Sequence, residues 1–178
     1  MFISHLSADA ELLGALRAGD ARAFDWLVAR YESRLIEYTR YLTGAGVDAE
    51  DITQRTFLSL WQMVSKGRLP DNLRSWLYRV AHNHACDVQR RRYRLPTASF
   101  EAANDARYAQ DSLDDVDRSL FVRGILDGLS EHGREIIYLR CFQDLTFEEI
   151  GRYLGIRRQS AHGRFKRALQ QASELTEE

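Results

Sequence analysis

The side chains best suited to binding a ligand form a cationic run between Lys66 and Arg94. This segment holds eight Lys and Arg residues against two Asp residues, a net charge of +6. Arginine and lysine bind phosphate groups, and planar or polar side chains among them can hold an unstacked base. The pattern is therefore suited to nucleic acid as a ligand. A solvated cationic helix end, in which arginine complements the helix dipole, explains this segment equally well when it is taken alone.

A second cationic segment runs from Arg152 to Arg167 and contains six basic residues and no acid. It overlaps a predicted pair of short helices, residues 146–154 and 158–172, which are joined through Gly155. Such a pair is typical of a helix-turn-helix motif, whose second helix enters the major groove of DNA. The outward face predicted for this second helix carries Gln159, Gly163, Lys166, Arg167 and Gln170. A helical hairpin with a basic surface is the alternative interpretation.

A third surface is predicted on the helix from Asp48 to Lys66, where an apolar side chain lies among polar ones. Helical spacing places Leu58 on the same outward arc as Asp51, Gln54 and Arg55. A single exposed leucine usually needs no explanation. On a compact polar face, however, it can anchor a partner protein.

The remaining reactive side chains do not form a recognisable catalytic or metal site. His82 and Cys86 have the i, i+4 spacing of two metal ligands, but His84 faces the predicted core and a third ligand is missing nearby. Cys86 and Cys141 form no CxxC motif, and neither a glycine-rich phosphate loop nor a nucleophile triad is visible. An enzyme is therefore the less favoured class, and we expect no cofactor and no metal.

The elements that must carry these surfaces are all predicted to be helices. Apolar residues recur at helical spacing over residues 8–18, 21–41, 48–66, 72–94, 116–128, 131–142, 146–154 and 158–172. Residues 95–117 lack sustained periodicity and carry six acids against one Arg, which predicts a linker. The predicted fold class is all-α, with two small helical domains joined by this acidic linker. They are an N-terminal helical bundle over residues 1–94 and a C-terminal helix-turn-helix domain over residues 118–178.

The helix over residues 72–94 is predicted to divide its faces between a core and a ligand. The inward face carries Leu73, Trp76, Leu77, Val80, Ala81, His84 and Val88. The outward face carries Ser75, Arg79, His82, Cys86, Arg90 and Tyr93, with Asn83 at its edge. The preceding loop, Lys66–Asn72, brings Lys66 and Arg68 beside the start of this helix.

In this order and over this length, the two helical units resemble a bacterial sigma factor of the extracytoplasmic-function group. The N-terminal match covers about Leu12 to Arg94 and depends on AGDARAFDWLVARY, DAEDITQRTFLSLW and RSWLYRVAHNHACDVQRRR. The C-terminal match covers about Val122 to Leu175 and depends on LSEHGREIIYLRCFQDLTFEEIGRYLGI and SAHGRFKRAL. No single fragment is decisive, but the pair of matches is specific.

The resemblance implies an alternative sigma factor that binds RNA polymerase core and directs promoter recognition and transcription initiation. The residues implied for the −10 element are Lys66, Arg68, Asn72, Arg79, Asn83 and Arg90, with Asn83 at a base edge. Those implied for the −35 element are Arg158, Gln159, His162, Lys166 and Arg167. Those implied for the clamp coiled coil of the largest polymerase subunit are Asp51, Gln54, Arg55 and Leu58. The C-terminal domain is further implied to contact the polymerase flap.

The expected partners are therefore RNA polymerase core and promoter DNA, in the cytoplasm and without membrane insertion. The sequence leaves open whether an anti-sigma factor or a Ser/Thr kinase regulates the chain. A helix-turn-helix regulator that acts without polymerase is the alternative function. It would need a sensor or dimerisation domain where this chain has a basic helix.

The sequence departs from the family's pattern at three places. Ser130, Glu131 and His132 replace a proline turn, and Ala161, His162 and Gly163 stand where valine, lysine and serine are common. The −35 sequence therefore cannot be transferred from relatives.

The third departure is Arg55, which follows Gln54 where an acid is usual. Arg55 can pair with Asp51 one turn earlier, so we expect a weaker polymerase contact than is usual for the family. Phosphorylation at Thr53 or Thr56 would restore negative charge. Both threonines, however, are predicted on the apolar arc, where a phosphate would disturb the packing.

Overall fold

The computed structural model describes residues 3–20, 22–44, 49–94 and 128–177, and their regular secondary structure is entirely α-helical. The chain divides into two compact units, Met1–Arg107 and Tyr108–Glu178. The predicted linker and nearly all of the predicted helix over residues 116–128 lie outside the described residues. Among the described helices, none has both the length and the apolar character needed to cross a membrane.

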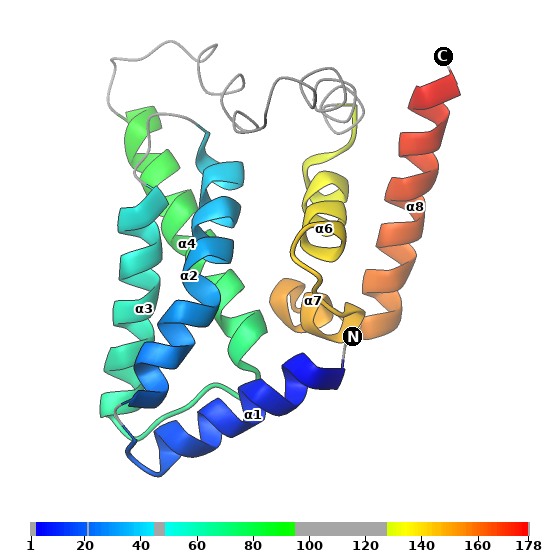
Figure 1. Ribbon diagram of the computed structural model, residues 1–178. Helices are drawn as coiled ribbons and strands as arrows, with labels where there is room; N and C mark the ends of the chain where they lie inside the picture. Colours follow the sequence, from blue (N-terminus) through cyan, green and yellow to red (C-terminus); the bar gives the residue numbers. More distant parts are fainter. Residues whose placement is uncertain (1–2, 21, 45–48, 95–127, 178) are drawn as a thin grey trace, which may run out of the picture. The chain divides into compact units, whose positions relative to one another are not determined.

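The first unit contains a bundle of three helices with a fourth across its end. Its described helices are α1 (Ile3–Arg17), α2 (Arg22–Thr43), α3 (Ala49–Ser65) and α4 (Leu73–Arg94). Figure 1 shows α2, α3 and α4 side by side, with α1 lying across one end of them. The predicted bounds agree within two residues for α2, α3 and α4. The first helix begins at Ile3, five residues before its predicted start.

The core of this unit lies where α2, α3 and α4 face one another. Each of these helices has an apolar stripe that is stable only when another element covers it. The largest fully buried side chains here are Leu27, Leu35, Tyr38, Ile52, Leu60, Leu73, Leu77 and Tyr78. The rings of Tyr38 and Tyr78 meet across α2 and α4 with their centroids 5.0 Å apart. The bundle therefore fixes the outward faces of α3 and α4.

A buried polar cluster attaches α1 to this bundle. Asp9 of α1 accepts a hydrogen bond from the Tyr31 hydroxyl and pairs with Arg30 at 3.2 Å. Burial, followed by the charge of Asp9, raises the pKa of Tyr31, which keeps the hydroxyl protonated as a donor. The positive charge of Arg74 opposes this rise in the pKa of Tyr31. Arg74 is only 5% exposed. Arg74 therefore contributes to the fold, although the sequence counts it within the cationic run.

The second unit consists, in its described part, of α6 (Glu131–Cys141), α7 (Phe147–Leu154) and α8 (Arg158–Glu177). In Figure 1, α6 and α8 run alongside each other and α7 joins them at one end. Its buried apolar side chains include Leu129, Ile136, Leu139, Leu145, Ile150, Ala161 and Ala168. The last helix extends to Glu177, beyond the predicted end at Ala172. This unit therefore presents α8 on a compact support.

Capping residues and glycines set the angle between α7 and α8. Thr146 and Glu149 form a capping box, in which each side chain accepts the backbone N–H of the other residue. Gly155 ends α7 in the left-handed conformation, with φ of 67°. A Cβ atom on Gly151 would lie 2.8 Å from the Ile156 carbonyl oxygen. The turn therefore requires glycine at both positions, one for its conformation and one for close approach.

Candidate nucleic-acid and protein interfaces

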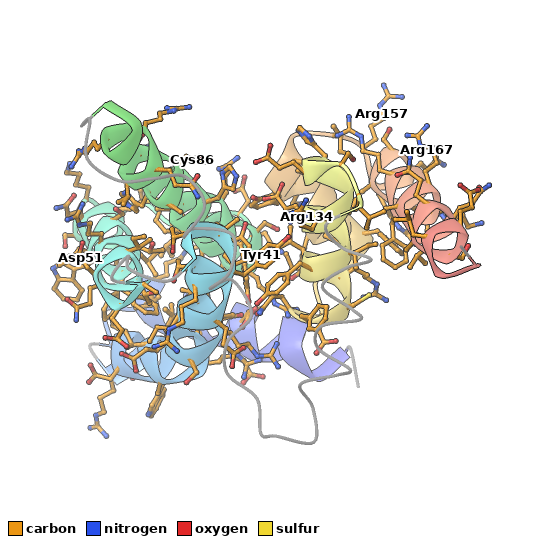
Figure 2. The ribbon with its side chains drawn as sticks, turned by 90° about the horizontal axis from the view of Figure 1, so that it is seen from above. Tyr41, Asp51, Cys86, Arg134, Arg157 and Arg167 are labelled. Carbon is orange, nitrogen blue, oxygen red and sulfur yellow. The ribbon has the colours of Figure 1, made fainter. Side chains whose placement is uncertain are left out.

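The outward face of α3 brings together the four residues predicted to contact a partner protein. Gln54, Arg55 and Leu58 are exposed, and Asp51 is half-buried one turn before Arg55. Figure 2 shows Asp51 on the outer side of α3. Leu58 is 57% exposed, so it contributes little to the core of its own unit. We call Asp51, Gln54, Arg55, Leu58 and Trp61 the α3 face.

Trp61 is a member of this face that sequence reasoning missed. Its helical position predicts an inward ring, but the structure leaves 49% of the side chain exposed. The ring meets Phe24 of α2 edge to face, with centroids 5.1 Å apart. Trp61 follows Leu58 by three residues, which is the spacing of neighbours on a helix surface. The apolar part of the face is therefore a leucine–tryptophan pair. The spacing of Trp61 from Leu58 is the feature of the sequence that could have predicted it.

An ion pair on this face confirms the expected coupling of Arg55 to Asp51. The guanidinium nitrogen lies 2.7 Å from the carboxylate oxygen, and both side chains are nearly half exposed. Exposed i, i+4 pairs contribute about 0.3–0.5 kcal/mol to stability, so the fold does not depend on it. Its larger consequence is that Arg55 neutralises an acid that faces solvent.

The two threonines considered for phosphorylation are buried in the folded unit. Thr53 is 2% exposed and Thr56 is 0% exposed. The Thr56 hydroxyl donates to the Ile52 carbonyl oxygen at 2.9 Å. A kinase would therefore reach either hydroxyl only after local opening of α3.

Replacing Arg55 by glutamate should tighten binding to a partner whose matching surface is basic. The change lowers the local charge by two and replaces the Arg55–Asp51 ion pair by two like charges one turn apart, at a cost of about 0.5 kcal/mol in helix stability. We expect affinity for polymerase core to rise several-fold in calorimetric or fluorescence titration at low salt, and the gain to shrink as salt screens it. Arg17→Glu, at an exposed position of α1, makes the same change in net charge and is the control. Weaker binding by a folded Arg55→Glu protein would contradict a basic partner surface.

A second surface is formed by the loop before α4 and the first turns of that helix. Lys66 and Arg68 are exposed on either side of Gly67, which has φ of 69°. Asn72 is half-buried, and its side-chain oxygen accepts the backbone N–H of Ser75 at 2.8 Å. Asn72 therefore caps α4, so the side chain predicted for DNA also has a structural role.

The exposed face of α4 holds the other side chains predicted for the −10 element. Arg79 and Asn83 are exposed and lie one helical turn apart. Arg90 is 74% exposed in its side chain and pairs with Asp87 at 3.6 Å. Ser75 was predicted on this face, which is wrong, because it is only 5% exposed at the start of the helix. Within the helix itself, the exposed cationic residues therefore begin at Arg79. We call Lys66, Arg68, Arg79, Asn83 and Arg90 the α4 face.

The histidines and the cysteine of α4 have local partners. The Cys86 sulfur lies 3.7 Å from both ring nitrogens of His82. Within the described residues, no group of three His, Cys, Asp or Glu side chains is arranged to hold a metal ion. His84 Nε2 lies 3.2 Å from the Ser59 hydroxyl of α3. Burial lowers the pKa of His84, so at neutral pH this ring is uncharged and links α4 to α3.

The third surface is the outward side of α8. The five residues predicted there are all exposed: Arg158, Gln159, His162, Lys166 and Arg167. We call these five residues the α8 face. Figure 2 shows Arg167 extending outward from α8, away from α6. Arg157, which was absent from the predicted set, is also exposed just before the start of α8. Its position next to Arg158 in the cationic segment could have predicted that Arg157 belongs to the same surface.

An aromatic contact holds the imidazole of His162. The Phe147 ring meets it edge to face with centroids 4.8 Å apart, and Phe165 lies 5.4 Å from Phe147. The guanidinium of Arg140 lies over the Phe147 ring, 5.1 Å from its centroid. Such contacts are worth about 0.5–1.5 kcal/mol each beyond the buried area. The first residue of α7 therefore helps to fix a side chain of the α8 face.

Comparison with known proteins finds a match for each of the two units. The family model "Sigma-70 region 2" matches residues 27–95, and "Sigma-70, region 4" matches residues 125–171. The chain is 30% identical over 164 residues to ECF RNA polymerase sigma factor SigM of Mycobacterium tuberculosis, covering 92% of this chain and 82% of that one. It is 34% identical over 164 residues to RNA polymerase sigma factor CarQ of Myxococcus xanthus, covering 89% and 92%.

A solved structure has a similar fold. It is CnrH in complex with the cytosolic domain of CnrY, at a TM-score of 0.67 and 25% sequence identity. The likeness covers 96% of this chain and 97% of that one. Both sequence and structure comparisons therefore extend over the two units together.

Proposed function

The chain belongs to the sigma-70 family, within its extracytoplasmic-function group, and we propose that its three faces divide the work of promoter-specific initiation. As a sigma factor it directs RNA polymerase to promoters. In our proposal the α3 face binds the clamp coiled coil of the largest polymerase subunit. The α4 face takes the single-stranded −10 region, and the α8 face reads the −35 element in the major groove. This work is done in the cytoplasm, where the polymerase acts.

The observation that carries this proposal is the exposed pair Leu58 and Trp61 on a unit that also has a cationic face. A helix-turn-helix regulator that acts alone needs its DNA-binding helix, but it has no need for an apolar protein-binding pair on α3. Exposed tryptophan and leucine within a polar rim are suited to anchoring in a partner's pocket. Asp51 would offer an acid to a basic partner at the same place once Arg55 releases it.

The α4 face has the chemistry needed to hold an opened strand. Arg79 and Arg90 neutralise phosphates, and the amide of Asn83 can donate to and accept from a base edge. Unstacking a base costs a few kcal/mol, so capture requires a prepared set of contacts. An α-helix fixed by a bundle on its other side provides such a set without further ordering.

We also propose an anti-sigma factor as the regulator. The solved complex of CnrH contains the cytosolic domain of CnrY, which supports a protein partner for this fold. The burial of Thr53 and Thr56 argues against a kinase acting on the folded α3. An inhibitor that covers Leu58 and Trp61 would block polymerase directly.

Site-specific photocrosslinking tests the three assignments together. p-Benzoylphenylalanine placed at Leu58, Arg79 or His162 in the full chain is irradiated in the complex of core polymerase with promoter DNA. The proposal expects adducts with the largest polymerase subunit, the non-template strand at −10 and the −35 duplex, respectively. Glu37, exposed on α2, is the control position and should give none of the three. Adducts with DNA from Leu58, or with none of the expected partners, would refute the division.

A further inference from the structure

The one glycine on the outward side of α8 has no explanation within its own unit. Gly163 lies in the interior of a helix, where glycine is among the least favourable residues. A Cβ atom built on it would meet no other atom within 4 Å, and its φ is not in the left-handed region. The fold therefore permits alanine at this position, and alanine would stabilise the helix.

Other glycines of this unit are explained by their neighbours. Gly155 has a positive φ, and a Cβ on Gly151 would clash with backbone. A Cβ on Gly133 would lie 3.1 Å from the Ser130 hydroxyl and 3.4 Å from the Ala168 Cβ. Gly163 differs from all three, because the space in front of it is open.

The position of Gly163 indicates what fills that space. Gln159 lies four residues before it, and Lys166 and Arg167 lie three and four residues after it. These spacings place all four residues on one side of the helix. Gly163 is thus surrounded by exposed side chains of the α8 face. A side chain at position 163 would project from the middle of the surface that meets DNA.

We propose that Gly163 is a close-approach position for the −35 duplex, at which a base edge in the major groove contacts the backbone of α8. This inference rests on the proposed role of the α8 face. Removal of the side chain lets the helix sit deeper in the groove, which brings Gln159 to base edges and Lys166 and Arg167 to phosphates. A methyl group at position 163 would hold the helix away and lengthen these contacts together. Gly163 is then a specificity-determining residue that acts through the absence of a side chain.

The substitution Gly163→Ala separates this proposal from a merely structural role, because it should move stability and DNA affinity in opposite directions. Thermal unfolding of the full chain should show a higher midpoint for the second unit, by about 4 °C. The holoenzyme should bind its promoter at least tenfold more weakly, measured by fluorescence anisotropy on a duplex taken from a start site mapped with the unmodified protein. Binding to a duplex of scrambled −35 sequence should change little, since phosphate contacts dominate there.

Gly14→Ala is the matched control, because Gly14 is a helical glycine of α1 that also has no atom within 4 Å of a built Cβ. It should stabilise the first unit and leave promoter affinity unchanged. A stabilised Gly163→Ala protein with unchanged promoter affinity would overturn the inference. A destabilised protein would overturn it too, because the fold itself would then require glycine. The charge variant Lys166→Ala with Arg167→Ala is measured alongside. If it also binds as the unmodified protein does, the role of the α8 face fails, and not the role of Gly163 alone.

Discussion

Removing both cations at the exposed centre of α8, by Lys166→Ala with Arg167→Ala, should reduce promoter-specific transcription by at least an order of magnitude. Both side chains are exposed and lie next to each other on the α8 face. Each phosphate contact releases condensed counterions, so its loss should lower the log–log salt slope of DNA binding by about 1. The double variant should therefore show a slope smaller by about 2, together with weaker binding at every salt concentration.

The control keeps both charges but exchanges the side chains. Lys166→Arg with Arg167→Lys should retain the salt slope and most of the transcription, since phosphate is held by charge at these positions. Multi-round transcription from a mapped promoter, with core polymerase in excess, measures the effect. Unchanged output from the double alanine variant would show that the α8 face does not hold the −35 element.

Loss of the two central side chains of the α4 face, by Arg79→Ala with Asn83→Ala, should block promoter opening. Base capture by stacking and polar contacts is worth about 1–3 kcal/mol per base, so opening should fall on the order of 10-fold to 100-fold. Permanganate reactivity of unpaired thymines around −10 reports the opened state. A template with mismatched, already melted −10 positions should restore transcription, because it removes the unstacking cost.

The comparison of the two templates decides the role of these residues. A defect confined to the fully paired template places Arg79 and Asn83 in opening. Equal defects on both templates would assign them to general binding instead. Arg22→Ala, which removes an exposed cation from α2, should behave like the unmodified protein on both.

Much of this architecture follows from local signals in the sequence. The capping box of Thr146 and Glu149, the Ser130 cap and the Gly155 turn are each marked in the sequence by residue types at fixed spacing, and all are present. Each of these features depends on neighbours within a few residues, so the sequence alone contains the relevant chemistry. The exposure of Leu58 was also predictable, because its polar neighbours on one helix arc define a solvent-facing side.

The features that were mispredicted depend on contacts between distant parts of the chain. Ser75 lies on the outward arc of a helical projection and Arg74 belongs to the cationic run, but the folded unit covers both side chains. The environment of Arg74 includes Tyr31, which carries the hydrogen bond to Asp9 of α1. The spacing of residues within α4 cannot predict this contact with another helix. Trp61 shows the opposite error, because its ring meets Phe24 of α2 yet stays 49% exposed.

The contribution of Gly163 illustrates a third case, in which the sequence shows an anomaly and the structure gives it meaning. A glycine inside a predicted helix can indicate a kink, a close neighbour or an external contact. The open space before Gly163 excludes a close neighbour within its unit, its φ is not positive, and we assign the glycine to an external contact.

The promoter-directing role of this chain can be tested by mapping transcript 5′ ends made in vitro by core polymerase with the chain on a whole genomic template. We expect start sites that are absent with core alone and that share two sequence elements upstream at a fixed spacing. Leu58→Ala should lose these start sites through weaker binding to core. An absence of new start sites, with specific duplex binding by the chain in the absence of polymerase, would contradict the account and indicate a regulator that acts alone.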